Sequence, residues 1–173
     1  RLALLWARYL KPFAGLASRR FAPALGMAPK RVAANQILTG RRVYPAEGNK
    51  RRRVALLAGC AQQVLRPSIN QSTIRVLNRL GCDVVVVNGE GCCGALVHHL
   101  GEESASRDRA RALIKAWEQE QNKEGLDAII VNTSGCGSHV KDFGHLLKDD
   151  DEWRAPAMRV ASLTKDVSEI IDK

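Results

Sequence analysis

The chain has 173 residues, of which 45% are hydrophobic and 26% are charged, so it can bury a core and form one domain, with or without an extension. The uncharged apolar stretches near its start are far shorter than the roughly 18–20 residues that span a bilayer, and Arg8 interrupts the one candidate signal-peptide core. A transmembrane helix is therefore excluded and a secretory signal is disfavoured.

The net charge of +9 is concentrated in the first third of the chain. Residues 1–53 carry 13 of the 27 basic residues and a single acid, Glu47, whereas residues 54–173 carry 14 basic and 17 acidic residues. Such a basic arm is typical of contact with an acidic partner, an anionic membrane surface or nucleic acid, and a solvated linker is the alternative. Nucleic acid ranks last, because the arm has few interleaved aromatic residues and the rest of the chain is acidic.

The arm is predicted to contain two short helices and a linker. Apolar residues within 2–10 recur on one helical face, Lys11-Pro12 should end that helix, and residues 13–25 predict a second one. Residues 26–53 hold prolines, glycines and basic runs with little periodicity, which indicates a linker. Regular structure is expected to begin at Val54, so the predicted domain covers residues 54–173.

This domain alternates signals for buried strands and amphipathic helices. In chain order the predicted elements are a strand at 54–58, a helix at 67–80, a strand at 83–88, a helix at 104–122, a strand at 127–132, and helices at 140–147 and 163–171. This alternation predicts the α/β fold class, with a small parallel sheet and helices on both of its faces.

A cysteine follows each predicted strand within a few residues. Cys60 follows the first strand, Cys92 and Cys93 the second, and Cys136 the third. Because ligands of parallel sheets bind beyond the carboxyl ends of the strands, four sulfur atoms can converge at that edge. Flanking glycines allow a positive φ angle and close approach of a bulky ligand, and they are the candidate cofactor-binding positions: Gly59, Gly91, Gly94 and Gly135.

Four thiolates with these spacings are typical of an iron–sulfur cluster. There are 31 residues between Cys60 and Cys92 and 42 between Cys93 and Cys136, unlike the closely spaced ligand pairs of zinc fingers. Thiolates are soft ligands that suit such clusters, and adjacent cysteines can reach two different irons. Structural disulfides are disfavoured without a secretory signal, and a transient disulfide of Cys93 stays open. The fifth cysteine, Cys82, is predicted to be a small buried side chain.

Three motifs around these cysteines resemble the cysteine-rich CCG domain family: A-G-C-A-Q-Q at 58–63, G-E-G-C-C-G-A at 89–95 and T-S-G-C-G-S at 133–138. That family includes the cysteine-rich subunit of heterodisulfide reductase and the iron–sulfur subunits of several flavin-linked dehydrogenases. From about Arg52 to Lys173, the residues of these motifs and the spacing between them are most similar to those of the iron–sulfur subunits of glycolate oxidase, also called glycolate dehydrogenase. The resemblance implies that Cys60, Cys92, Cys93 and Cys136 are metal ligands.

The chain departs from the family pattern in two ways. Members usually carry a ferredoxin-like region and two CCG domains, whereas this chain shows one CCG domain and opens at Arg1, so we expect it to be an internal piece of a longer subunit. The family pattern ends in C-x-x-C, whereas here Cys136 is followed by His139. His139 could replace the missing ligand, as imidazole does in some clusters, or it could be a surface or capping residue.

The resemblance implies an electron-transfer module of a flavin-linked 2-hydroxy-acid dehydrogenase, with a [4Fe–4S] cluster in the full subunit. Its expected partners are flavin-containing dehydrogenase subunits, its expected location is the cytoplasm, and the basic arm would contact the inner membrane peripherally. No catalytic residue is predicted, because the sequence has no recognisable nucleophile set. The alternatives are a thiol–disulfide enzyme like heterodisulfide reductase, reacting through Cys92 or Cys93, and a non-catalytic docking domain with structural or zinc-bound cysteines.

Overall fold

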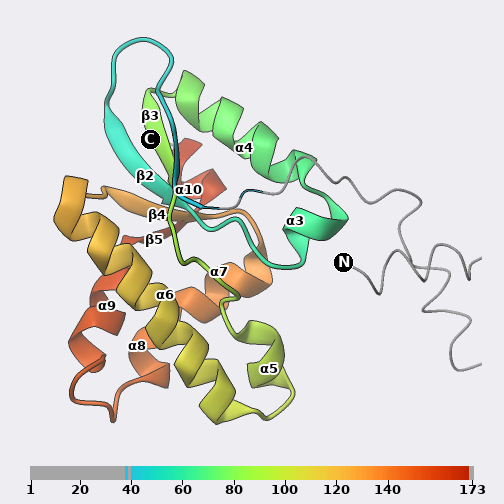
Figure 1. The fold of residues 1–173 in the computed structure, drawn as a ribbon, viewed down its shortest axis with the longest axis vertical. Coiled ribbons are helices and arrows are strands. Elements are labelled where there is room, and N and C mark those ends of the chain that lie inside the picture. Colours follow the sequence, from blue (N-terminus) through green and yellow to red (C-terminus); the bar gives the residue numbers. More distant parts are fainter. Residues whose placement is uncertain (1–37, 39, 172–173) are drawn as a thin grey trace, which may run out of the picture.

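The computed structural model describes residue 38 and residues 40–171, and within them five strands form one mixed sheet in the order β1-β3-β2-β4-β5 (Figure 1). The strands are β1 (Arg42–Tyr44), β2 (Arg52–Leu56), β3 (Cys82–Val86), β4 (Ala128–Val131) and β5 (Thr164–Asp166). Strands β3, β2, β4 and β5 run parallel to one another, and β1 is antiparallel to β3. The α/β class is confirmed, although the sheet is mixed and not wholly parallel.

Helices lie on both faces of this sheet, as predicted (Figure 1). They are α3 (Gln62–Leu65), α4 (Ser68–Arg79), α5 (Ala95–His99), α6 (Glu103–Glu124), α7 (Ser134–Lys141), α8 (Phe143–Leu146), α9 (Arg154–Leu163) and α10 (Val167–Ile171). Helices α4 and α10 contribute to the core on one face, and α6 to α9 contribute to the core on the other. Within the part of the chain that the structure describes, none of these helices is both long and apolar enough to cross a bilayer.

The sheet is buried on both faces, which explains why its central strands are continuous apolar runs. Successive residues of β2 alternate between the two cores: Val54 and Leu56 face α4, whereas Ala55 packs on the side of α6. On that second side, Trp117 of α6 is only 1% exposed. This packing holds the three central parallel strands in register, so that their carboxyl ends lie at one edge.

The expectation that regular structure begins at Val54 is wrong. Strand β2 begins at Arg52, and β1 lies within the predicted linker, where Arg42 is paired with Val86 at the edge of the sheet. Leu38, before β1, is also buried. A three-residue edge strand forms by pairing with a distant strand, so it leaves no periodic signal in its own sequence. The two predicted arm helices lie outside the described residues.

The predicted helix at 163–171 is confirmed only from Val167 onward. Helix α9, which was not predicted, ends at Leu163, and the chain then forms β5 before α10 begins at Val167. Thr164 is buried, and its hydroxyl donates a hydrogen bond of 2.7 Å to the carbonyl oxygen of Val160. The predicted helix at 140–147 corresponds to the end of α7 and to α8, with a break at Asp142.

Candidate metal centre

The four candidate cysteines lie at the carboxyl edge of the sheet on three segments. Cys60 lies between β2 and α3, Cys92 and Cys93 lie between β3 and α5, and Cys136 lies in the first turn of α7. Strands β3, β2 and β4 are adjacent and parallel, so the segments that follow them meet at the same edge. The expected placement of these four residues is therefore observed.

Their sulfur atoms form one interacting group. The Cys60 Sγ lies 3.4 Å from the Cys92 Sγ. Burial, and then the hydrogen bond with Cys92, raise the pKa of the Cys60 thiol. Interaction with the Cys136 thiol, and then burial, raise the pKa of Cys93, while the same interaction lowers the pKa of Cys136. Cys92 also affects the pKa of Cys93, so the four thiols influence one another at this edge of the sheet.

The group opens to solvent on the side of Cys60. Cys60 is exposed, Cys92 and Cys136 are half-buried, and Cys93 is buried at 3% exposure. Cys82 lies at the opposite, amino-terminal end of β3 and is only 1% exposed, which confirms that it is a buried core side chain. A ligand that bridges the four sulfurs would thus contact the buried Cys93 on its inner side, and it would be accessible to solvent at Cys60.

The candidate glycines are of two kinds. Gly59 and Gly94 have φ angles of +70° and +93°, in the left-handed region that favours glycine. A Cβ atom on Gly94 would also lie 3.1 Å from the backbone oxygen of Ser106, so this position admits no side chain without strain. Gly91 and Gly135 lack a positive φ, contrary to expectation, and a Cβ atom there would meet nothing within 4 Å. Contact of these glycines with a cofactor stays a prediction.

His139 is not a surface or capping residue, contrary to the simpler expectation. Its side chain is buried, and its Nε2 lies 3.2 Å from the Ser106 Oγ, which in turn donates to the carbonyl oxygen of Gly94 at 3.4 Å. Its ring packs 5.1 Å from that of His98 and 5.5 Å from that of Phe143. Burial lowers the pKa of His139, and the charge of His98 lowers it further. His139 therefore links α7 to α6 and to the loop of Cys93, and its Nε2 faces Ser106.

A network of side-chain amides and hydroxyls lies next to the segments that carry the cysteines. Gln62 donates to Asn70 Oδ1 at 2.5 Å and to Asn132 Oδ1 at 2.7 Å, and it accepts from Thr133 Oγ1 at 2.6 Å. Asn70, which is 1% exposed, donates to the carbonyl oxygen of Ala58 at 2.7 Å. The network joins the segment of Cys60 to the segment that leads into α7. The sequence signal that could have indicated this network is Asn70, a polar residue seven positions before the buried Leu77 and therefore on the same face of the helix.

We expect Gln62→Leu to lower the free energy of unfolding by about 1–3 kcal/mol, because it leaves partners such as buried Asn70 and half-buried Asn132 with fewer hydrogen bonds. We also expect faster alkylation of Cys60, whose segment loses its anchor. Urea denaturation and timed labelling would measure both. Gln63→Leu is the matched control, since the buried Gln63 Oε1 has no hydrogen-bond partner among the described residues. Equal effects of the two variants would contradict the role given to Gln62.

Glu90 places a buried carboxyl group beside the thiols. Its Oε1 accepts a hydrogen bond of 3.0 Å from Trp117 Nε1, and its buried Oε2 has no partner among the described residues. Burial raises the pKa of Glu90 to about 8, against the opposing hydrogen bond from Trp117. The carboxyl is therefore mostly uncharged near neutral pH, and it adds little negative charge next to Cys92.

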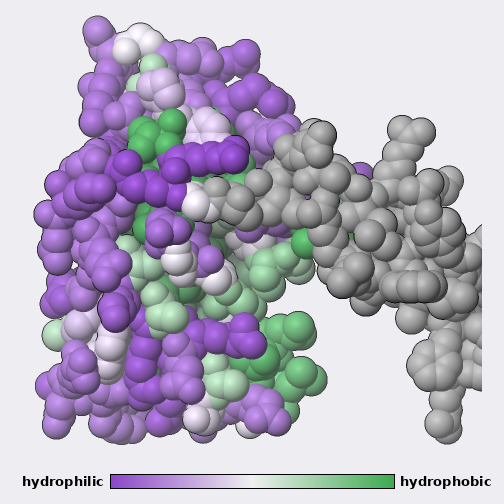
Figure 2. All heavy atoms as spheres, viewed as in Figure 1, coloured by the Kyte–Doolittle hydropathy of each residue, from purple (hydrophilic) through white to green (hydrophobic). Residues whose placement is uncertain are grey.

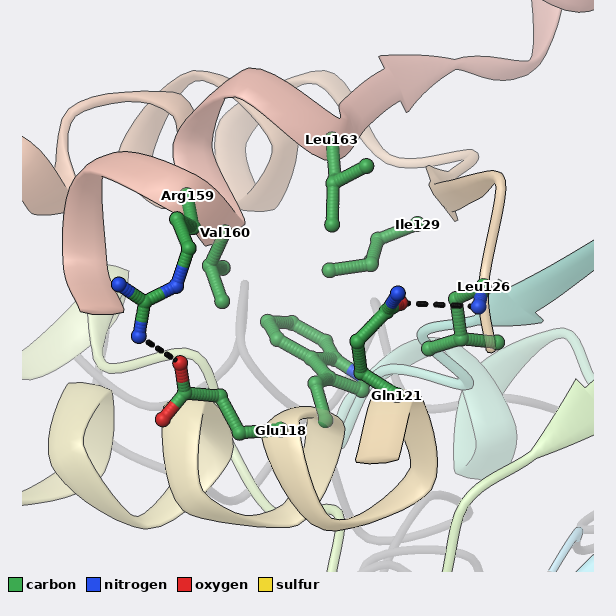
Figure 3. A pocket seen from close by; sticks show the side chains of 8 residues that line it. Glu118, Gln121, Leu126, Ile129, Arg159, Val160 and Leu163 are labelled. Carbon is green, nitrogen blue, oxygen red and sulfur yellow. Dashed lines mark hydrogen bonds and ion pairs between the residues drawn. The ribbon is translucent and has the colours of Figure 1, made fainter. Parts of the chain in front are cut away.

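An apolar pocket lies elsewhere, between α6 and α9 (Figure 3). Its cavity measures about 230 Å³. The lining includes Leu126 and Leu163, which lie just before β4 and β5, so the pocket is near the amino-terminal ends of these two strands. Glu118 and Arg159 form an ion pair at its side (Figure 3). The pocket contains no cysteine or histidine, so it belongs to a different part of the molecule from the thiol group.

The donor set consists of four thiols, which are soft ligands. Across residue 38 and residues 40–171, no group of three or more His, Cys, Asp or Glu side chains is arranged to hold one metal ion. Cys60 and Cys92 lie 3.4 Å apart at the edge of the sheet that also carries Cys93 and Cys136, and four thiols of this kind are the usual ligands of iron–sulfur clusters. The residues present therefore fit an iron–sulfur cluster.

The cysteine pattern agrees with a known family. The family profile "CCG: Cysteine-rich domain" matches residues 54–141, a segment that contains all four cysteines of the thiol group. The chain belongs to this cysteine-rich CCG domain family. The resemblance drawn from the three motifs is thus confirmed.

Two of the similar relatives are iron–sulfur subunits by name. The chain is 42% identical over 121 residues to the glycolate oxidase iron-sulfur subunit of Escherichia coli (strain K12), covering 70% of this chain and 30% of that protein. It is 35% identical over 130 residues to the probable glycolate oxidase iron-sulfur subunit of Bacillus subtilis (strain 168), covering 75% and 28%. It is 32% identical over 118 residues to lactate utilization protein A of an Exiguobacterium strain, covering 68% and 46%.

The chain therefore spans less than half the length of these curated relatives. No solved structure gives a significant match to this CCG domain.

Proposed function

We propose that this CCG domain is an electron-transfer module that holds an iron–sulfur cluster through Cys60, Cys92, Cys93 and Cys136. The observation that carries the proposal is that these four sulfurs form one group at the carboxyl edge of the sheet. The names of the similar relatives support it. A [4Fe–4S] cluster is the proposed type, on the ground of the family resemblance, and four thiolates are a usual ligand set for it.

The protein's own residues would hold and position that group. When bound, a cluster supplies one-electron oxidation and reduction at a potential that its surroundings set. The Gln62 network holds the Cys60 segment against the start of α7, and the chain from His139 through Ser106 to Gly94 holds the Cys92–Cys93 loop against α6 and α7. Exposed Cys60 marks the side from which a redox partner would approach.

The proposed setting is a flavin-linked dehydrogenase complex that oxidises a 2-hydroxy acid such as glycolate, in which this domain passes electrons onward. An apolar patch beside the thiols supports contact with a partner: Figure 2 shows it over the region of α5, where Leu96 and Leu100 are 68% and 71% exposed. We further propose a cytoplasmic location, with the basic arm on partner subunits or on the anionic inner membrane leaflet.

Metal analysis of anaerobically purified and reconstituted protein tests this proposal. We expect about four iron atoms and a similar amount of acid-labile sulfide per chain, together with a reversible change in visible absorbance on reduction. Zinc without iron would instead favour a non-catalytic domain with structural cysteines. Protein that takes up no metal under these conditions would contradict the electron-transfer role.

A further inference from the structure

Two of the four thiols lie close enough to be joined by a small movement. The Cys60 and Cys92 sulfurs are 3.4 Å apart, and a disulfide bond is about 2.05 Å long, so they need to approach by about 1.4 Å. Cys60 is exposed and Cys92 is half-buried, so an oxidant in solution reaches this pair. Cys93 is only 3% exposed and is shielded from the same oxidant.

The backbone next to this pair is also uncrowded. Gly59 precedes Cys60, and a Cβ atom there would meet only the Cβ of Gln62, at 3.6 Å. Gly91 precedes Cys92, and a Cβ atom there would meet nothing within 4 Å. Such a backbone can take up the small shift that a disulfide requires.

The other thiol pair is held more firmly. Cys136 is part of α7, and Cys93 packs into the core that includes α6. The neighbouring Gly94 lies tightly against α6, since a Cβ atom on it would come within 3.1 Å of Ser106, and this restricts movement of the Cys93 loop. Oxidation is therefore expected to select the first pair over the second.

We propose that Cys60 and Cys92 form a reversible disulfide when no cluster is bound. With hydrogen peroxide as the oxidant, the exposed Cys60 thiol takes one peroxide oxygen to become a sulfenic acid, and one water leaves. Cys92 then displaces that oxygen as a second water, so two thiols lose two protons and two electrons, and the sulfur–sulfur bond forms. A dithiol reductant restores both thiols by exchange.

The disulfide depends on the sulfur geometry and not on the proposed function. It has one consequence for that function: it removes two of the four thiolate ligands, so oxidised protein takes up no iron until it is reduced.

Peptide mapping of the full 173-residue chain tests the inference. The reduced protein is freed of metal with a chelator and treated with about one equivalent of hydrogen peroxide at about pH 9, because the thiolate is the form that reacts. It is then blocked with N-ethylmaleimide and digested with trypsin. Cys60 then lies in peptide 54–75, because Pro67 protects the bond after Arg66, while Cys92 lies in 80–107 and Cys136 in 124–141. We expect peptides 54–75 and 80–107 to be linked, and dithiothreitol to separate them.

Single variants assign the bond within peptide 80–107, which also contains Cys82 and Cys93. Cys82→Ser and Cys93→Ser should keep the link, whereas Cys92→Ser should lose it and slow the loss of thiols at least about tenfold. A dominant link to peptide 124–141, or oxidation of Cys60 to sulfinic acid without any link, would overturn the inference.

The two proposals fail separately. If the link forms but the reduced protein takes up no iron, the cluster proposal fails and the disulfide stands. If the reduced protein takes up iron but the metal-free protein forms no link, the disulfide alone is wrong.

Discussion

Serine in place of Cys60, Cys92 or Cys136 is expected to reduce the iron content of reconstituted protein at least about fivefold. The four sulfurs form one group, so each variant removes one soft ligand from a set of four, and a serine hydroxyl is a poor replacement for a thiolate. Iron and acid-labile sulfide per chain, measured after anaerobic reconstitution, check this expectation.

Cys82→Ser is the matched control for this series. Cys82 is buried at the other end of β3, away from the thiol group, so its variant should keep the iron content of the unsubstituted protein. Thermal unfolding of each metal-free variant separates ligand loss from loss of the fold. Unchanged iron in Cys136→Ser would remove α7 from the proposed ligand set, and equal loss in Cys82→Ser would show that the effect is not specific.

Glu120→Gln is expected to lower the free energy of unfolding by about 2 kcal/mol. Glu120 is 4% exposed, it accepts hydrogen bonds from Arg41 at 3.0 and 3.1 Å, and it pairs with the buried Arg53 at the start of β2. The variant removes a negative charge that compensates for the positive charge of the buried Arg53 guanidinium. The expected loss of stability is smaller than for a buried ion pair that is broken completely, because Arg53 still forms an ion pair of 3.2 Å with Glu124.

Glu118→Gln provides the comparison on the same helix. Glu118 pairs with Arg159, whose side chain is 60% exposed, and such surface pairs contribute at most about 1 kcal/mol. Urea denaturation near neutral pH should therefore show a clearly larger loss for Glu120→Gln. Equal losses would mean that the ion pairs of Glu120 do not anchor β2 to α6.

The same carboxyl predicts a dependence of stability on pH. The hydrogen bond from Arg41, and then that from Arg53, hold the pKa of Glu120 below its ordinary value of 4.5. A lowered pKa in the folded state means that this stabilisation is complete above pH 4.5 and is lost as the pH falls through the folded-state pKa. The decline in stability below pH 4.5 should therefore be shallower in Glu120→Gln than in the unsubstituted protein.

The convergence of the four cysteines could be predicted because it depends on a regular feature of α/β sheets. Each cysteine follows a strong apolar run within a few residues, and parallel strands bring such positions to one edge. The motifs around Cys60, Cys92 and Cys136 were sufficient to indicate the family, which the profile match confirms. Burial of Cys82 followed in the same way from its place at the start of a strand of valines.

The edge strands and the orientation of His139 could not be predicted in this way. Strands β1 and β5 have three residues each, and they exist because β3 and β4 offer open edges to them. His139 occupies the last position of a family cysteine motif, yet its side chain turns to Ser106, which is far from it in the sequence. These partners are determined by the packing of segments that are distant in the sequence, so they cannot be predicted from the local sequence pattern.

The sequence by itself determined the α/β class, the edge at which the thiols gather and the family, because strand periodicity and motif spacing are local properties of the chain. Only the tertiary structure decided that the Cys60 sulfur lies 3.4 Å from that of Cys92, and that an amide network holds the segments of Cys60 and Cys136 together. Distances between side chains are set by the packing of helices and strands from the whole domain, and spacing along one chain cannot specify them.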